Sequence, residues 1–412
     1  RQYFIGRTDM TEKLYDQNSH QAQTAALVVS CSPVSDGFEV LLDRTVLFPE
    51  GGGQPSDTGW IDQARVLSCR EEHGDVFHKV DRALAVGEMV SVRLDWARRF
   101  DFMQQHTGEH LLSFSFYKLF EAANVGFHLA LDYATIDFDK PLSREQIAEA
   151  ELLANTYVWR NLPVQAAFYD SEEDVKSLPL RKHAEGLTAP IRIVSIEDAD
   201  MCTCCAPHCA LTGEIGSIFV LDAAGYKGGT RITFLCGERA LKRHRAEHDD
   251  LDAIGRRFST SRDNAVSAVV KLSDEYGALK KRERDLAKEL NGFLSAELRT
   301  NAKQAGKYRV AAKLFTGMDA GRLKDLAQCG AEPGMLVVLF SEVDGKLSYV
   351  LASGEKFPLD VGELIPAVNA ATGGKGGGRG TLAQGMAQSV SGAEETARQV
   401  EDYLVRRLKE SK

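Results

Sequence analysis

The sequence predicts an α+β protein of several domains, and the order of its local patterns supports this fold class. Short β-rich runs fill residues 1–95, mixed strand-like and helix-like runs fill 96–240, and a charged amphipathic stretch covers 241–302 before a small α/β segment at 303–412. Strands and helices that cluster in blocks in this way are typical of α+β folds. At roughly 100–200 residues per domain, a chain of 412 residues holds two to four domains. We therefore expect these four segments to be its structural parts.

Composition limits the classes of function. Hydrophobic residues make up 43% of the chain and charged residues 26%, which is ordinary for a soluble globular protein. No run of about 18 apolar residues occurs, so no membrane span is predicted. The net charge of -9 argues against indiscriminate nucleic-acid binding, although it is compatible with a local basic patch. No apolar N-terminal run resembles a signal peptide, so we expect a cytoplasmic protein with reduced thiols.

Segment 1–95 is predicted to be a β-barrel-like domain with one unusual loop. The loop runs from Leu47 to Gly59 and places three consecutive glycines between two prolines, a composition that no regular element has. Its backbone can approach another surface closely. The polar residues Gln54 and Asp57 favour a loop that faces a site over an ordinary cluster of turns. The expected strands are Thr24–Ser30, Phe38–Leu42, Arg65–Ser68, Val76–Val80 and Met89–Leu94.

Segment 96–240 begins with an expected helix that carries two histidines followed by an apolar run. A strand hairpin, a second helix, further strands and a cysteine-rich loop follow it. The expected bounds are Gly126–Asp139 for the hairpin, Arg144–Asn161 for the second helix, and Val164–Phe168, Ile191–Ile196 and Tyr226–Phe234 for the strands.

Two short motifs almost a hundred residues apart predict a metal site. His106 and His110 are four residues apart on a helix, so they share one face, and Cys204 and His208 repeat the same spacing. Together they offer the nitrogen and sulfur ligands that zinc prefers. A cysteine cluster also occurs in disulfide-rich secreted chains, but only eight cysteines are present and half of them are scattered, which favours metal binding. The part played by the other thiols of the loop, Cys202, Cys205 and Cys209, stays open.

Segment 241–302 is predicted to be a long amphipathic helix, arranged as an antiparallel hairpin or a coiled coil. Its apolar residues recur at three- and four-residue steps among many charges. We expect it to be a spacer or a dimerisation stalk. The apolar positions are Val269, Leu272, Tyr276, Leu279, Leu286, Leu290, Leu294 and Leu298.

Segment 303–412 is predicted to be a small α/β domain that contains a second glycine-rich run, Gly373–Gly380. The spacing of this run fits neither a Walker phosphate loop nor a dinucleotide-binding fingerprint. Its backbone N–H groups, with Lys375 and Arg379, could contact a phosphate or an RNA backbone, and a plain solvent loop is the alternative. The expected strands are Tyr308–Phe315, Met335–Glu342 and Leu347–Ala352, and the expected helices are Val361–Ala371 and Ala393–Lys409.

With these motifs in order, the chain resembles the freestanding alanyl-tRNA editing proteins of the AlaX type, in their long form. The motifs are FPEGGGQPSDTG at Phe48–Gly59, HTGEHLL at His106–Leu112, CCAPH and TGEIG within Cys204–Gly216, and GGKGGGRG at Gly373–Gly380. The last motif resembles the C-terminal tRNA-binding domain of alanyl-tRNA synthetases. The chain departs from the family at Cys205-Ala206-Pro207, where the family usually has Gly-Gly-Thr; the ligand positions remain, but contacts of this loop with substrate are put in doubt.

The resemblance implies hydrolysis of the ester that joins serine or glycine to the 3′ end of alanine tRNA. A synthetase pocket distinguishes such small differences by only about 1–3 kcal/mol, so a second, hydrolytic site is needed. It also implies that His106, His110, Cys204 and His208 bind Zn2+. Four protein ligands normally indicate a structural ion, whereas a catalytic zinc keeps one position open. Displacement of a ligand, five-coordination and a purely positional ion therefore remain alternatives.

Further residues are candidates for the site. We expect His106, His110, Gln54 and His128 in the catalytic set. Glu109 is expected on the surface or behind the ligands, because it points about 100° away from His110 on a helix. Gln105 and Thr107 are expected either in the pocket or in core and capping roles. The expected substrate contacts are Gly51, Gly52, Gly53, Thr107, Lys227, Arg231, Lys375, Gly376, Gly377 and Arg379.

Two other functions stay open. A non-catalytic RNA-binding protein with a structural zinc site would lack hydrolysis. A metal-dependent phosphoesterase would need clusters of Asp and His that the C-terminal segment lacks. The expected partner is alanine tRNA mischarged with serine or glycine, and the helical segment or the C-terminal domain could form a homodimer. The sequence does not distinguish serine from glycine as the preferred substrate.

Overall fold

A computed structural model of the chain describes residues 10–182, 189–388 and 392–410. The chain divides into two compact units, Arg1–Ala253 and Ile254–Lys412. Both units contain sheets and helices, so the expected mixed α+β class is confirmed. The first nine residues of the expected N-terminal domain and the last two of the C-terminal domain lie outside the described ranges. Within those ranges, no helix combines the length and the apolar character needed to cross a membrane.

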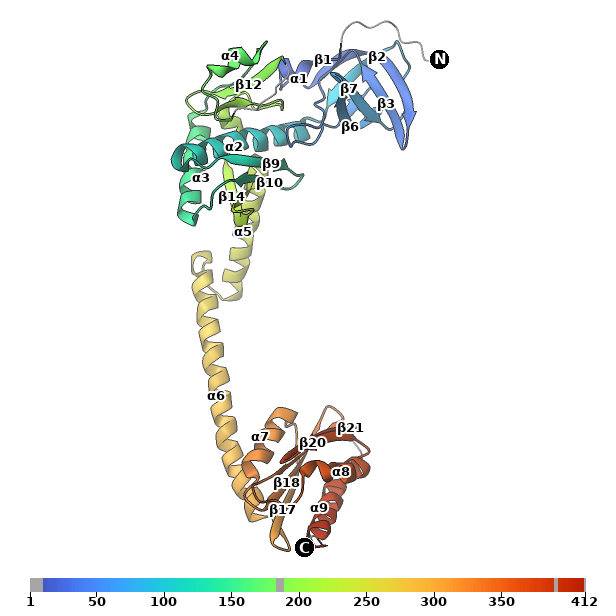
Figure 1. Cartoon of the computed structure of the whole chain (residues 1–412), viewed down its shortest axis with the longest axis vertical. Helices are drawn as coiled ribbons and strands as arrows, with labels where there is room; N and C mark the ends of the chain where they lie inside the picture. The colour runs from blue at the N-terminus through green and yellow to red at the C-terminus, as the bar shows by residue number, and fades with distance from the viewer. Residues whose placement is uncertain (1–9, 183–188, 389–391, 411–412) are drawn as a thin grey trace. The chain divides into compact units, whose positions relative to one another are not determined.

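Six strands of the first unit close into a barrel in the order β2-β3-β7-β6-β5-β8 (Figure 1). Alternate residues face inward and build a core of aliphatic side chains. In β6, Ala64 and Val66 face inward, and a bulge before Ser68 shifts the alternation so that Cys69 also faces inward. The barrel strands are β2 (Gln23–Val34), β3 (Gly37–Leu42), β5 (Gly59–Ile61), β6 (Ala64–Glu72), β7 (Asp75–Val80) and β8 (Met89–Leu94); β1 (Glu12–Lys13) pairs with β4 (Arg44–Thr45), and α1 covers Leu14–Gln17.

The glycine-rich loop leaves the barrel between β4 and β5, and a buried ion pair fixes its base. Asp57 in the loop faces Arg99 in the first turns of α2 (Trp96–Phe120), and both side chains are fully buried. The carboxylate of Asp57 also accepts a hydrogen bond of 2.7 Å from the N–H of Phe48, and Arg99 donates to the carbonyls of Ser19 and Val46. Because removal of one partner would leave an uncompensated buried charge, this pair holds loop and helix together.

Helix α2 is buried on almost every side, which explains how so many of its polar residues can form a site. Its N-terminus is capped by the carboxylate of Asp95, which accepts from the N–H of Arg98. A four-stranded sheet in the order β14-β15-β10-β9 packs on one side of it, and the sheet β11-β12-β13 lies on another (Figure 1). These elements are β9 (Asn124–Leu129), β10 (Ala134–Phe138), α3 (Arg144–Arg160), β11 (Val164–Tyr169), α4 (Glu172–Lys176), β12 (Ile191–Ile196), β13 (Met201–Thr203), a 3-10 turn at Thr212–Ile215, β14 (Ile218–Tyr226) and β15 (Gly229–Cys236).

The charged stretch expected at 241–302 forms two helices. Helix α5 covers Gly237–Arg257, and α6 covers Ala265–Thr300 after a short 3-10 turn at Arg262–Asn264. Along most of α6 the apolar residues are exposed, and only its last turns, which include Leu298, pack against the C-terminal sheet. The segment expected to be a long amphipathic helix, arranged as a hairpin or a coiled coil, is therefore divided into two helices before α6 begins.

A six-stranded sheet in the order β16-β17-β18-β19-β21-β20 forms the centre of the second unit. Successive residues of β18 face opposite sides of it: Leu336 and Val338 pack against α8 and α9, whereas Val337 and Leu339 pack against α7 and the end of α6. Such a strand is buried on both faces and is therefore almost entirely apolar. The elements are β16 (Lys303–Ala305), β17 (Tyr308–Thr316), α7 (Ala320–Gly330), β18 (Met335–Val343), β19 (Lys346–Ser353), α8 (Ile365–Thr372), β20 (Lys375–Arg379), β21 (Leu382–Gln388) and α9 (Ala393–Glu410).

Three sequence-based expectations for this unit need correction. The run Gly373–Gly380 is not a plain loop, because Lys375–Arg379 form the edge strand β20, paired with β21. The helix expected over Val361–Ala371 is a 3-10 turn followed by α8, whose first turn carries Pro366. Helix α7 was not expected. Glycine has low strand propensity, which explains why β20 was missed. Helix α7 does carry a helical pattern, with Leu323, Leu326 and Ala327 buried at three- and four-residue steps after the N-cap Asp319, so its absence from the expectations has no physical cause.

Candidate metal centre

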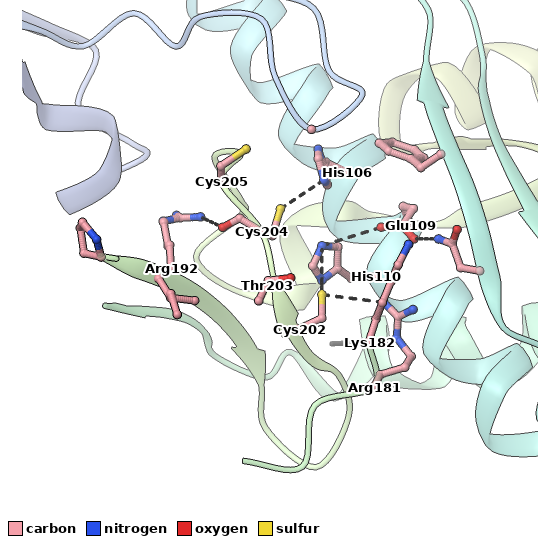
Figure 2. A pocket seen from close by; sticks show the side chains of 15 residues that line it. His106, Glu109, His110, Arg181, Lys182, Arg192, Cys202, Thr203, Cys204 and Cys205 are labelled. Atoms are coloured by element: carbon pink, nitrogen blue, oxygen red, sulfur yellow. Dashed lines mark hydrogen bonds and ion pairs between the residues drawn. The ribbon is translucent and has the colours of Figure 1, made fainter. Parts of the chain in front are cut away.

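Four side chains from two remote segments meet at one point of the first unit. His106 and His110 come from α2, and Cys204 and His208 come from the loop after β13; their four ligand atoms all lie within 4.8 Å of one another. The sulfur of Cys204 lies 3.4 Å from Nε2 of His106 and 3.3 Å from Nε2 of His208. The expected convergence of the two motifs is therefore present in the fold. Figure 2 shows three of the four side chains, His106, His110 and Cys204.

Each of the three imidazoles turns Nδ1 away from this point and towards a protein partner. Nδ1 of His106 lies 2.9 Å from the side-chain oxygen of Gln54, Nδ1 of His110 lies 3.0 Å from the carboxylate of Asp200, and Nδ1 of His208 lies 3.1 Å from the hydroxyl of Thr107. A protonated Nδ1 that donates to such a partner leaves the lone pair on Nε2, where a metal can bind.

The two sulfur–nitrogen separations at Cys204 fit a tetrahedral ion with these ligands. Zinc bonds of about 2.0–2.1 Å to nitrogen and about 2.3 Å to sulfur, at a tetrahedral angle, put N and S roughly 3.6 Å apart. The sulfur–nitrogen distances of 3.3 and 3.4 Å around Cys204 are close to that value. The ligand set itself, three imidazoles and one thiolate, suits a borderline-soft ion better than Mg2+ or Ca2+.

The electrostatics of Cys204 and His208 also suit a cation. Burial opposes the thiolate of Cys204, yet the imidazoles of His106 and His208 hold its pKa well below the usual value. Burial lowers the pKa of His208 to about 3, so its imidazole is neutral. A thiolate and a neutral imidazole are the protonation states that metal ligation requires.

A second group of possible ligands shares His110 with the first. It consists of His110, Asp200 and Cys202, all buried. Asp200 is not free for a second ion, because Arg181 donates two hydrogen bonds to its carboxylate at 2.6 and 2.9 Å. Although burial opposes its charge, the hydrogen bonds from Arg181 and His110 lower the pKa of this carboxyl. The arrangement is therefore a support for His110 and not a separate metal site.

The centre opens into a cavity of about 430 Å³ that is large enough for a small polar ligand (Figure 2). The glycine-rich loop closes one side of it: a Cβ on Gly52 would lie 3.3 Å from the sulfur of Cys205 and 3.9 Å from the ring of His106. A Cβ on Gly53 would lie 2.8 Å from the carbonyl oxygen of Phe127, and φ at Gly53 is +79°, so this position requires glycine. Gly51 lines a neighbouring cavity instead.

The structure places two of the expected polar residues behind the ligands and a third elsewhere. Gln54 and Thr107 are buried and contact Nδ1 of His106 and His208, so they orient ligands and do not line the main cavity. Gln105 is buried at the other side of α2, where its side chain bonds the backbone of Cys236.

Other expected residues lie away from the centre. His128 is exposed and is absent from the cavity lining, because the alternation of β9 turns its neighbour Phe127 inward, 4.9 Å from the ring of His106. Arg231 forms two hydrogen bonds with Asp137, and Lys227 lies in the β14–β15 turn next to Tyr226. These side chains do not join His106 and His110.

The four expected contacts of the C-terminal domain belong to the second unit. Lys375, Gly376, Gly377 and Arg379 are exposed on the edge strand β20. Close packing explains part of the glycine run, since a Cβ on Gly376 would lie 2.6 Å from Cα of Gly385 in the neighbouring strand, whereas a Cβ on Gly377 would meet nothing within 4 Å.

Several residues of the site were missed from the sequence. Asp200, Arg181 and Asn124 carry no local motif, and only the fold brings them to α2. The expectation of a surface position for Glu109 is wrong: the residue is 4% exposed and lines the cavity. Glu109 lies between two metal ligands in the sequence of one helix, which was a sign of a site residue. Its direction on the helix, about 100° from His110, did not show that it is exposed, because α2 is buried on almost every side.

Comparison with known proteins identifies the family. Residues 191–233 match the "Threonyl and Alanyl tRNA synthetase second additional domain", and residues 306–406 match the "DHHA1 domain". The alanyl-tRNA editing protein AlaX-L of Pyrococcus horikoshii is 31% identical over 92% of this chain and 95% of its own length, and mouse alanyl-tRNA editing protein Aarsd1 is 30% identical over 95% and 98%. The C-Ala domain of Aquifex aeolicus alanyl-tRNA synthetase aligns with 26% of this chain and 98% of that domain, at 21% identity and a TM-score of 0.24. By its similarity over almost the whole length to such relatives, the chain belongs to the family of alanyl-tRNA editing proteins.

Proposed function

We propose that the chain is a trans-acting aminoacyl-tRNA deacylase that hydrolyses alanine tRNA mischarged with serine or glycine. The observation that carries the proposal is the convergence of His106, His110, Cys204 and His208 beside a cavity closed by the glycine-rich loop. Membership of the editing family supports the substrate class. A synthetase rejects such near-isosteric amino acids only weakly, so a separate hydrolytic site has a clear purpose.

The four converging residues would hold Zn2+ as the resident ion. When bound, the ion supplies Lewis acidity for a water or an ester carbonyl. The protein's own part is to fix the ligands: Gln54, Asp200 and Thr107 keep the proton on Nδ1 of each imidazole. The glycine-rich loop and Phe127 cover the side of the cavity next to His106 and leave no room there for a bulky group.

The remaining segments would serve the tRNA. We assign residues 1–95 to a β-barrel domain, 96–240 to the editing domain, 241–302 to a helical linker and 303–412 to a tRNA-binding domain. Exposed Lys375 and Arg379 at the ends of β20 are the proposed contacts to the RNA backbone, with Gly376 and Gly377 between them. The linker would also be the site of a homodimer.

A second candidate is an RNA-binding protein with a structural zinc. The observation that favours it is the complete set of four protein ligands, which is the usual composition of a closed site. The two candidates differ in whether the ion is needed for hydrolysis.

Deacylation of seryl- and glycyl-tRNA(Ala), with correctly charged alanyl-tRNA(Ala) alongside, tests the proposal. We expect hydrolysis of the first two, its loss after dialysis against a chelator, and at least a hundredfold lower rate in His106→Ala because a ligand is lost. His73→Asn, an exposed change in the barrel at a position with φ of +51°, is the matched control and should keep wild-type rates. Normal turnover by His106→Ala would defeat the assignment, and zinc binding without any deacylation would favour the RNA-binding alternative.

A further inference from the structure

Glu109 lies beside the metal centre but is not one of its four ligands. Its side chain is only 6% exposed, yet it lines the cavity next to His110. Among the described residues that line this cavity it is the one carboxylate, whereas Arg181, Lys182 and Arg192 bring positive charge. An ionised carboxylate in such a place needs partners to be stable, so its contacts indicate what it is for.

One oxygen of Glu109 is fixed by the protein. Oε1 accepts a hydrogen bond of 2.6 Å from the hydroxyl of Ser113 and another of 2.6 Å from the side-chain amide of Asn124. The amide of Asn124 is itself oriented, because its oxygen accepts from the N–H of Gly126 at 2.9 Å. These contacts set the direction of the carboxylate without any help from a metal.

The other oxygen has no hydrogen-bond donor among the described residues. Oε2 lies 3.7 Å from Nε2 of His110, which is too far for a hydrogen bond, and this nitrogen belongs to the ligand set. The nearby cations do not occupy it. Arg181 is bound to Asp200, and Arg192 donates to the carbonyls of Cys204 and Ala206. Lys182 lines the same cavity, but within the described ranges it forms no ion pair with Glu109. Oε2 is therefore an available acceptor beside the metal centre.

We propose that Oε2 of Glu109 binds the α-ammonium group of the aminoacyl ester. The proposal rests on the proposed deacylase function and identifies the group that holds the substrate's amino end. A charge-assisted bond between ammonium and carboxylate is the strongest one this cavity can offer to an aminoacyl group. The α-nitrogen is two bonds from the ester carbonyl carbon, so an ammonium held at Oε2 keeps the scissile bond next to the imidazole cluster.

This contact would make the enzyme distinguish esters with a free α-amine from esters without one, whatever the side chain of the amino acid. Every aminoacyl ester with a free amine carries the ammonium, so Glu109 does not separate serine from alanine. Esters whose amine is blocked, such as peptidyl-tRNA, lack the charge and would leave a buried carboxylate unpaired, which a polar site rejects strongly. The enzyme would thus spare growing peptides.

Binding of two non-hydrolysable analogues tests the proposal. The probes are 3′-deoxy-3′-(L-seryl)amino-adenosine and the same compound with 3-hydroxypropanoyl in place of seryl, which lacks only the amine. They are titrated calorimetrically at pH 6.5, where an α-amine is protonated, into the full chain with zinc and after chelation. We expect the wild type to bind the seryl analogue at least tenfold more tightly, with or without zinc.

The variants separate this role from a structural one. In Glu109→Gln the two analogues should bind within about twofold of each other, while affinity for the desamino compound stays near that of the wild type. Glu121→Gln, at the exposed C-terminal end of the same helix, should keep the wild-type ratio. Asn124→Ala, which removes one donor to Oε1, should lower the ratio in part. If Glu109→Gln does not fold, the comparison of analogues on the wild type still decides the matter.

Equal binding of both analogues to the wild type would overturn the proposal. So would a Glu109→Gln variant that keeps the wild-type ratio, or one whose deacylation of seryl and desamino esters falls by the same factor, since that would make Glu109 a base for water. A wild type that discriminates the analogues yet fails to deacylate seryl-tRNA(Ala) would sink the proposed function and leave the ammonium site standing.

Discussion

Three chemically different acceptors hold the imidazoles of the metal centre: the amide oxygen of Gln54, the hydroxyl of Thr107 and the carboxylate of Asp200. A carboxylate increases the basicity of the imidazole that it orients more than a neutral oxygen does. His110 should therefore be the strongest nitrogen donor to a metal. His106 is oriented by a neutral amide, so substitution of that amide residue is the simplest way to change how strongly a ligand binds the metal.

Gln54 offers that test at the scale of one residue. Gln54→Ala removes the acceptor at Nδ1 of His106, so we expect metal affinity to fall by about 10–100-fold. Gln54→Glu should restore or exceed the wild-type affinity, because a carboxylate accepts the same bond and the unpaired buried Nε2 of Gln54 is eliminated. Competition for zinc against a chelator of known affinity measures both, with Gln399→Ala on the exposed face of α9 as control. Unchanged affinity in Gln54→Ala would mean that Gln54 does not orient the ligand.

His78, in the barrel core, predicts a pH effect that is unrelated to the metal. Burial lowers its pKa to about 4 from 6.5. Between these values the unfolded chain binds more protons than the folded one, so stability is lost as pH falls below about 6.5 and the loss is complete near pH 4. At pH 5 the titration of His78 has lowered the free energy of unfolding by about 2 kcal/mol. Urea unfolding at pH 7.5 and 5.0, followed by hydrogen exchange of the barrel strands, should show a smaller pH effect in His78→Gln and an unaltered one in His128→Gln.

At the scale of elements, the edge strand β20 predicts opposite outcomes for neighbouring glycines. A Cβ on Gly378 would lie 2.3 Å from Cα of Ala383 in β21, whereas a Cβ on Gly377 would meet nothing within 4 Å. Gly378→Ala should therefore push the strands apart and cost about 1–3 kcal/mol. Gly377→Ala should be neutral or slightly stabilising, because alanine restricts the unfolded chain. Chemical unfolding of the full chain measures both; equal effects would show that β20 does not pair as described.

The same strand shows where sequence reasoning reaches its limit. The bounds of β12, from Ile191 to Ile196, agree with the prediction because a β-branched run with clear ends determines a strand locally. In β20 the deciding factor is the close approach of Gly376 and Gly378 to β21, a contact between strands that composition does not reveal. Glycine runs are ambiguous for this reason.

In the metal centre, too, some residues could be predicted from the sequence and others could not. His106, His110, Cys204 and His208 could be found because equal spacing in two segments is a local signal, and they do converge. Asp200 and Asn124 could not, since each reaches the site from an element whose position depends on the whole fold of the first unit. Supporting residues of this kind follow from the structure alone.

At the scale of the whole molecule, one face of α6 carries a long stripe of exposed apolar side chains. Leu272, Leu279, Leu286 and Phe293 are exposed and recur every seven residues. A second exposed set, Val269, Tyr276 and Leu290, precedes members of the first by three residues, and Glu283 occupies the remaining position. Spacings of three and seven place both sets in the a and d positions of a coiled coil, which is stable only when a second helix covers it.

We therefore predict that the full chain forms a homodimer through α6. Leu279→Glu puts a charge into the apolar seam of both copies, and each buried leucine contributes roughly 1.5–3 kcal/mol, so the dimer dissociation constant should rise at least a hundredfold. Ala278→Glu introduces the same residue one position away, on an exposed face outside the seam, and should leave association unchanged. Sedimentation equilibrium over a range of concentrations distinguishes the two. A wild type that stays monomeric throughout, or two variants that weaken association equally, would show that the stripe on α6 serves another purpose than joining two copies of this chain.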